Sequence, residues 1–208
     1  MAIKKMKVLV ACEYSGIVRD AFAKKGHDAW SCDILPTESK GNHIQDDVLK
    51  HINKDWDLMI AHPPCTYLSK AGARWLYKEN KINNERYEKG LKAKEFFLKL
   101  LNCNIPKICI ENPTPMNIFE LPKSSHHIEP YEYGHPYSKK TLLWLKNLPP
   151  LLATNILSKF TTFLPSNTGG KKRGQKYNIK YVSRDWNKTH SKFWTGIAEA
   201  MADQWSNL

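Results

Sequence analysis

Short apolar runs alternate with helical apolar spacing along the first part of the chain. Residues 7–12 form a nearly continuous apolar run, which is typical of a strand buried on both faces. After the turn at 13–16, apolar residues recur at helical spacing over 17–22, and Gly26 ends the predicted helix. Residues 29–33 predict a second strand, closed by an aspartate. This order and length indicate a parallel strand-helix-strand unit.

The same alternation continues to the end of the chain. Apolar runs predict further strands at 57–61, 107–110 and 141–145. Apolar residues at helical spacing predict one helix with a buried stripe over 93–101 and a closing helix with an apolar face over 194–205. Strands interleaved with helices indicate an α/β fold, with a sheet covered by helices on both faces.

One stretch departs from this pattern. Residues 146–190 are rich in Pro, Thr, Asn, Gly and Lys, and the segment 169–174 predicts a mobile basic loop. The sequence contains no internal repeat and no second core pattern. We therefore expect one domain over residues 1–208, with a basic, loop-rich insert at about 146–190.

Composition narrows the class of protein. A hydrophobic content of 41% is typical of a globular chain, and a net charge of +12 favours a polyanionic partner such as nucleic acid, or anionic substrates. The five cysteines form no C-x-x-C pair and no zinc-ligand spacing, so we expect no metal site. Without a secretory signal or an apolar stretch of about 20 residues, we expect a cytoplasmic protein with reduced thiols and no membrane span.

Three polar segments follow predicted strands, where α/β sheets bind ligands. They are Glu-Tyr-Ser-Gly at 13–16, Pro-Pro-Cys at 63–65 and Glu-Asn-Pro at 111–113. Each residue that precedes a proline is pushed into extended geometry, and each proline ring fixes its own φ. Cys65 therefore stands at the tip of a stiff path, which suits a nucleophile that is positioned in advance.

The order of these motifs resembles that of the DNA cytosine-5 methyltransferase family, over nearly the whole chain. The residues that carry the resemblance are Ala11–Gly16, Asp33, Asp47, Pro63-Pro64-Cys65, Glu111-Asn112-Pro113, Tyr133–Lys140 and a helix from about Phe193. The resemblance implies a Rossmann-like sheet of the class I S-adenosylmethionine-dependent methyltransferases. It also implies methyl transfer to carbon 5 of cytosine in DNA.

The resemblance assigns roles to the strand-end residues. Cys65, beside Pro64, would be the nucleophile that adds to carbon 6 of cytosine, and Glu111 would bond ring nitrogen 3 and support that addition. Asn112 would brace the loop that bears Cys65. The residues implied in binding S-adenosylmethionine are Glu13, Tyr14, Ser15, Gly16, Asp33, Ile34, Asp47, Val48 and Pro63. The residues expected to contact the substrate are Lys139, Lys140, Lys171, Lys172 and Arg173.

Several positions differ from the family pattern. Thr66 replaces a glutamine, Pro113 replaces a valine, and lysines at 139–140 stand where the family has paired arginines. Only about 45 residues lie between the strand predicted at 141–145 and the closing helix, where the family carries a target-recognition region. Two alternatives stay open: an enzyme that acts on RNA or free cytidine nucleotides, and a non-catalytic protein that binds nucleic acid or nucleotides.

Ordinary structural roles also stay open. Cys65 suits a buried structural thiol, Glu111 a strand end and Asp33 a helix cap, and Asp46 is an alternative to Asp47.

The aromatic residues Tyr67, Trp75 and Tyr77 suit either stacking on a base or packing. We predict a loop at His126 and His127.

Overall fold

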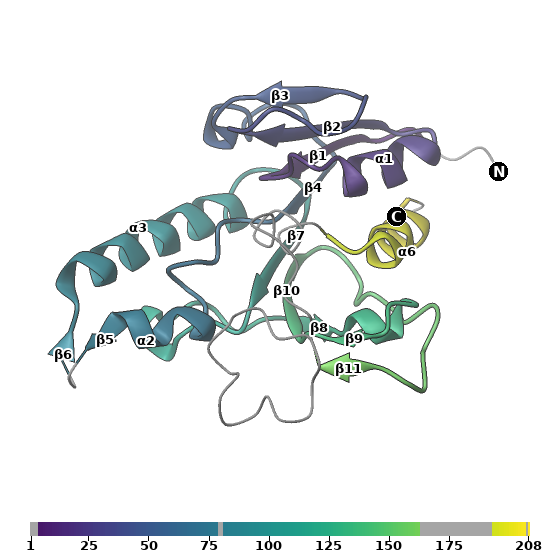
Figure 1. The fold of residues 1–208 in the computed structure, drawn as a ribbon. Helices are drawn as coiled ribbons and strands as arrows, with labels where there is room; N and C mark the ends of the chain where they lie inside the picture. The colour runs from purple at the N-terminus through teal and green to yellow at the C-terminus, as the bar shows by residue number, and fades with distance from the viewer. Residues whose placement is uncertain (1–3, 79–80, 163–192, 207) are drawn as a thin grey trace.

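The computed structural model describes residues 4–78, 81–162, 193–206 and 208, and its main feature is a seven-stranded sheet (Figure 1). The strand order is β3-β2-β1-β4-β7-β10-β8. Neighbouring strands from β3 to β7 are parallel, and β10 runs antiparallel to both β7 and β8. The bounds are β1 (Lys7–Ala11), β2 (Asp28–Asp33), β3 (His43–Gln45), β4 (Leu58–Ala61), β7 (Lys107–Pro113), β8 (His126–Ile128) and β10 (Thr141–Lys146).

Three longer helices cover the two faces of the sheet. The helices α1 (Ile17–Lys24) and α6 (Thr195–Trp205) lie on one face, and α3 (Asn84–Leu101) lies on the other (Figure 1). Both faces of the sheet are apolar, because the side chains of a buried strand such as β1 alternate between the two faces. Val8 and Val10 pack with the core of α1 and α6, while Leu9 and Ala11 pack with the core of α3.

This arrangement is a Rossmann-like α/β fold, so the fold class predicted from the sequence is confirmed. The chain builds β1, β2 and β3 outward in one direction and then returns to place β4 on the other side of β1. The order of the strands therefore reverses between β1 and β4. Ligands of open α/β sheets bind at such a switch point, beyond the carboxyl ends of the strands.

The sequence predictions fail mainly at short elements and boundaries. His126 and His127 lie in β8 and not in a loop, because β8 pairs with β10 at the edge of the sheet. Helix α3 begins at Asn84, well before its predicted stripe, and the Asn83 side chain caps it by accepting from the backbone N–H of Arg86. Helix α6 begins at Thr195, two residues after the predicted start.

The segment between β4 and α3 contains elements that the sequence did not predict. They are a 3₁₀ turn (Lys70–Gly72), α2 (Ala73–Leu76), β5 (Tyr77–Lys78) and β6 (Lys81–Ile82). Strands β5 and β6 pair with each other outside the main sheet, near the start of α3 (Figure 1).

The remaining short elements lie mostly in the second half of the chain. They are 3₁₀ turns at Val48–Lys50, Asn117–Phe119 and Pro130–Glu132, and the parallel pair β9 (Tyr137–Ser138) and β11 (Thr161–Thr162).

The predicted insert at 146–190 is described only as far as Thr162. Lys171, Lys172 and Arg173 lie outside the described residues, and a single domain over 1–208 stays a prediction. Among the helices of the described segments, none is long and apolar enough to cross a membrane. The described segments also contain no group of three or more His, Cys, Asp or Glu residues suited to holding a metal ion.

Candidate active site

The carboxyl ends of four parallel strands meet in one row. Ala11 pairs with both Cys32 and Ala61, and Ala61 pairs with Ile110. The next residue along each strand is therefore part of the same row at the edge of the sheet. These residues are Cys12, Asp33, His62 and Glu111.

Cys12 directly follows β1 and lies in the left-handed region, with φ of 59°. A non-glycine residue held there costs about 1–3 kcal/mol, and such positions cluster at functional sites. Burial raises the pKa of the Cys12 thiol, and Asp33, Cys32 and Asp47 raise it further. Two carboxylates predicted to hold the cofactor, Asp33 and Asp47, therefore lie close enough to Cys12 to act on the same thiol.

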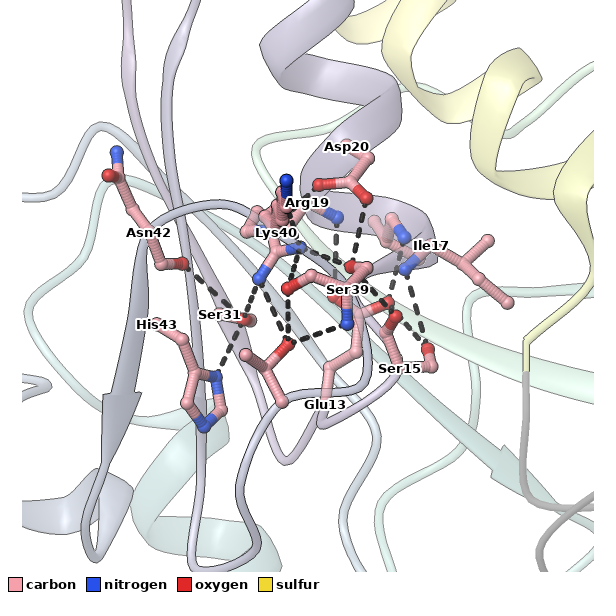
Figure 2. A network of polar contacts seen from close by, with 12 residues as sticks. Glu13, Ser15, Ile17, Arg19, Asp20, Ser31, Ser39, Lys40, Asn42 and His43 are labelled. Atoms are coloured by element: carbon pink, nitrogen blue, oxygen red, sulfur yellow. Dashed lines mark hydrogen bonds and ion pairs between the residues drawn. The ribbon is translucent and has the colours of Figure 1, made fainter.

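The carboxylate of Glu13 is buried against the start of α1 (Figure 2). It accepts hydrogen bonds from the backbone N–H groups of Val18 (2.7 Å) and Arg19 (3.2 Å), and from the hydroxyl of Ser15 (3.3 Å). A negative charge here satisfies free N–H groups and the positive end of the helix dipole. Glu13 therefore supports the loop 13–16 from within the protein.

Gly16 is required by the same loop. Its φ is +76°, and a Cβ atom there would collide with the hydroxyl of Ser39 and the guanidinium of Arg19. Only glycine meets both conditions without strain.

Arg19 joins α1 to the loop that follows Asp33 (Figure 2). Its side chain is fully buried and forms an ion pair with Asp20, with Nε 2.8 Å from the carboxylate. It also donates to Ser31 Oγ (3.0 Å), Ser39 Oγ (2.5 Å) and the carbonyl of Lys40 (3.1 Å). The sequence analysis missed Arg19, although a charged residue between the apolar positions of a predicted helix was a visible signal.

Asp33 begins this loop. One carboxylate oxygen of Asp33 accepts from the backbone N–H of Leu35 at 2.9 Å. The next side chain, Ile34, is 73% exposed. An apolar side chain this exposed beside a carboxylate offers a surface that a flat ring can cover.

The two candidate aspartates after β3 differ in their partners. Asp47 accepts from the backbone N–H of Leu49 at 3.0 Å, and Val48 beside it is buried. Asp46 bonds Lys50 at 2.7 Å and His51 at 3.1 Å, and these contacts, led by Lys50, hold the pKa of its carboxyl far below its usual value.

The loop that bears Cys65 is fastened by backbone bonds. Pro63 is buried, Pro64 is exposed and Cys65 is partly buried, with its carbonyl accepting from the backbone N–H of Ser69 at 2.9 Å. The segment 114–116 then holds residues 68–70, because Lys70 N–H donates to the carbonyl of Thr114 (2.9 Å) and Met116 N–H donates to that of Leu68 (2.7 Å).

Asn112, the residue implied as the brace, is fully buried. Its amide nitrogen donates to the carbonyl of Pro113 at 2.8 Å, and its Oδ1 has no partner among the described residues. The contacts that hold the Cys65 loop thus come from the backbone that follows Asn112.

The charges of Glu111 and Lys139 both act on the Cys65 thiol. Burial raises the pKa of the Cys65 thiol, the charge of Glu111 raises it further, and the charge of Lys139 lowers it. The thiol, the carboxylate and one predicted substrate-binding lysine therefore lie close together. The second predicted lysine, Lys140, is exposed next to them in the chain.

His62 is part of this group and was missed by the sequence analysis. Its Nδ1 lies 3.4 Å from Glu111 Oε2, and its ring packs on Phe193 with 4.5 Å between centroids. The other ring nitrogen, Nε2, is buried without a partner among the described residues. Its position directly after a predicted strand was the available signal.

The segment 133–140 docks against the start of α6. His135 Nε2 accepts from the backbone N–H of Gly196 at 3.0 Å, and the ring of His135 lies 5.0 Å from that of Trp194. Burial lowers the pKa of His135, which keeps the ring neutral and able to accept. A Cβ atom on Gly196 would collide with the carbonyl of Tyr133, so this close approach needs glycine.

The chain shows only limited similarity to known proteins. No family model matches the chain, and no curated protein matches it. One similar solved structure is described as a DNA modification methyltransferase encoded within a prophage of E. coli. It shares 12% identity at a TM-score of 0.41, over 68% of this chain and 46% of that one.

A second similar structure is the methyltransferase EhMeth of Entamoeba histolytica. It shares 16% identity at a TM-score of 0.44, over 74% of this chain and 58% of that one. The matches thus span about half the length of these solved chains. Likeness at this level decides neither a reaction nor a substrate.

Proposed function

We propose that this protein is an S-adenosylmethionine-dependent methyltransferase that methylates carbon 5 of cytosine in DNA through a covalent adduct with Cys65. One observation carries the proposal: a thiol and a carboxylate, Cys65 and Glu111, interact at the carboxyl ends of neighbouring strands. They stand beside the switch point between β1 and β4, where this fold binds ligands.

Cys65 makes carbon 5 reactive by attacking carbon 6. The sulfur–carbon bond forms as the electron pair of the 5,6 double bond moves toward carbon 5, and Glu111 donates a proton or hydrogen bond to ring nitrogen 3. Bound S-adenosylmethionine would supply the methyl group that carbon 5 takes, and its positively charged sulfur would keep the bonding electron pair and become a neutral thioether. Afterwards, loss of the proton from carbon 5 restores the double bond and breaks the bond to Cys65, which leaves as thiolate.

Protonation of Glu111 would favour both the bond to ring nitrogen 3 and the thiolate form of Cys65. The charged carboxylate of Glu111 raises the pKa of Cys65, and the ammonium of Lys139 lowers it. When Glu111 holds the proton that ring nitrogen 3 needs, its repulsion of the thiolate disappears and the attraction of Lys139 remains. The form of Glu111 that binds cytosine is therefore also the form that favours the reactive thiolate.

The residues at the ends of β1, β2 and β3 fit the proposed cofactor. Asp33 offers a carboxylate to ribose hydroxyls, as acidic residues at the end of this strand commonly do. The exposed side chain of Ile34 offers an apolar surface to the adenine, with Asp47 and Val48 nearby in the fold. Gly16 leaves room for the Ser39 hydroxyl and the Arg19 guanidinium, which hold the first loop in place beside the proposed cofactor site.

Covalent trapping tests the proposal. DNA that contains 5-fluorocytosine cannot lose its substituent at carbon 5 as a proton, so the adduct with Cys65 persists through denaturing electrophoresis. We expect an adduct with the wild-type protein and S-adenosylmethionine, and none with Cys65→Ala. The matched control is Cys103→Ala, which removes a buried thiol of the core and should still trap. Trapping by Cys65→Ala, or none by the wild type on any DNA, would refute the mechanism.

A further inference from the structure

A pocket of about 210 Å³ lies between the Cys65 loop and the start of α3. It is lined by Tyr67, Trp75, Asn83, Glu85, Arg86 and Lys89. We propose that this aromatic pocket binds an unpaired nucleobase next to the target cytosine, so that the substrate is single-stranded DNA. The inference rests on the proposed function, since it takes the target cytosine to be at Cys65.

The pocket is built to stack against a ring. Trp75 is 58% exposed, which is unusual for so large an apolar side chain, and the guanidinium of Arg74 lies 4.5 Å from its ring centroid. Within the pocket, Arg86 lies 4.9 Å from the ring centroid of Tyr67. Aromatic rings and arginine planes are the groups on which proteins stack unpaired bases.

Arg86 also holds an open hydrogen-bond donor. One of its terminal nitrogens donates to the carbonyl of Thr66 at 2.8 Å. Its Nε is buried without a partner among the described residues. A buried donor left unpaired costs about 1–3 kcal/mol, and a shift of the Arg86 side chain on binding would let a carbonyl oxygen of a base remove that cost.

The backbone is shaped to allow this position of Arg86. A Cβ atom on Gly72 would stand 2.7 Å from both the Arg86 guanidinium and the Thr66 carbonyl. Glycine at this position therefore leaves the room through which Arg86 reaches the Cys65 loop.

The distance to the nucleophile suits the next nucleotide of the same strand. Tyr67 lines the pocket and follows Cys65 by two residues, which span at most about 7 Å of chain. Adjacent bases of a strand lie about 3.4 Å apart when stacked and farther apart when splayed. A strand with its cytosine at Cys65 can therefore place a neighbouring base in the aromatic pocket.

The charges of the segment that surrounds the pocket favour a polyanionic strand. Residues 66–92 contain seven basic and three acidic side chains, an excess that attracts a polyanion. Inside the pocket, however, Glu85 pairs with Lys89 at 2.5 Å. This pairing offsets the charge of Lys89, and the rings of Tyr67 and Trp75 offer surfaces for an uncharged base, with the backbone phosphates along the basic surroundings.

The pocket is too small for a whole nucleotide cofactor, because sites for such ligands usually measure about 300–1,000 Å³. A base can enter it only when it is neither paired nor stacked between two neighbours. Single-stranded DNA meets this requirement without the cost of opening a duplex.

Binding measurements on the Cys65→Ala protein test the inference separately from catalysis. We would measure fluorescence anisotropy with labelled single-stranded DNA, duplex DNA and single-stranded RNA of one sequence. Trp75→Ala should raise the Kd for single-stranded DNA by about 5- to 150-fold, the loss expected for one base-stacking contact. The Kd for duplex DNA should change by less than about 2-fold. Ile156→Ala, which removes another exposed apolar side chain, is the matched control and should leave both Kd values unchanged.

An abasic site identifies the stacked nucleotide. Removing the base on one side of the target cytosine should weaken binding as much as Trp75→Ala does, and the two changes together should cost no more than either alone. An unchanged Kd for Trp75→Ala, additive losses, or tighter binding of duplex or RNA would overturn the proposal. Loss of trapping with these binding results intact would refute methyl transfer alone.

Discussion

The loops after β1 and β2 bond to one another, whereas α3, β7 and the residue after β4 each contain a buried polar atom without a partner among the described residues. Around Arg19, the guanidinium, the Glu13 carboxylate and the serine hydroxyls all have partners within the protein (Figure 2). Four buried side-chain polar atoms lack partners among the described residues, and three of them lie on the other side. They are His62 Nε2, Arg86 Nε and Asn112 Oδ1. Since buried polar groups are normally satisfied, these atoms distinguish the side on which the proposed cytosine and its neighbouring base would bind.

The largest effect that would test this contrast is expected at Glu111. Glu111→Gln cannot donate a proton to ring nitrogen 3, so methyl transfer should fall by about 10²- to 10⁴-fold. The measurement is transfer of a tritiated methyl group to single-stranded DNA at saturating cofactor. Glu95→Gln removes an exposed carboxylate from α3 and is the matched control, for which full activity is expected. Full activity of Glu111→Gln would remove the carboxylate from the mechanism.

Among the residues that hold the loops after β1 and β2 together, the largest effect is expected at Arg19. Arg19→Met leaves Ser31 and the carbonyl of Lys40 without their buried donor, so the free energy of unfolding should fall by about 2–4 kcal/mol. Because the loop after Asp33 loses its attachment, the Kd for S-adenosylmethionine should rise while the Kd for DNA stays nearly constant. Urea unfolding and calorimetric titration measure these quantities.

Arg74→Met is the control for Arg19, because it removes an exposed arginine from α2, in the segment between β4 and α3. Its free energy of unfolding should change by less than about 0.5 kcal/mol. Equal losses for the two variants would contradict the contrast between the two sides.

A smaller effect is expected in the acidity of Cys65. Glu111→Gln removes a negative charge that raises the pKa of Cys65 and should lower that pKa, whereas Lys139→Met should raise it. The rate of iodoacetamide alkylation at Cys65, followed by mass spectrometry across pH, reports both shifts. Shifts in the same direction for the two variants would show that charge is not the cause.

The strands and the change to polar residues after them were predictable because both depend on local pattern, although His62 was not recognised as part of the row at the sheet edge. A buried parallel strand requires a continuous apolar run, and its carboxyl end requires a change to polar residues, so Asp33, Cys65 and Glu111 were visible in the sequence. Arg19 was not, because its partners lie up to 21 positions along the chain. Tyr67 and Trp75 were visible in the sequence as candidates for base stacking, but the aromatic pocket was not, because it joins them to side chains at the start of α3.

The smallest effect is expected on stability in mild acid, and it involves two histidines held neutral. Burial lowers the pKa of His27 and of His135. His27 Nδ1 accepts from the backbone N–H of Met6 at 3.1 Å, and His135 Nε2 accepts from Gly196. A proton on either nitrogen would break its bond, so the unfolded chain binds protons more readily and stability should rise with pH.

The lowered pKa values of His27 and His135 set the pH range in which this loss of stability is expected. The loss should begin as pH falls below the ordinary histidine value of about 6.5, with a slope of at most about 1.4 kcal/mol per pH unit for each histidine. Urea unfolding between pH 7.5 and 5.5 measures it, and His27→Gln should reduce the slope. The exposed His127 provides the control, because His127→Gln should leave the slope unchanged. If His135→Gln flattens the slope as His27→Gln does, then the docking of α6 against segment 133–140 contributes to global stability and not only to the site.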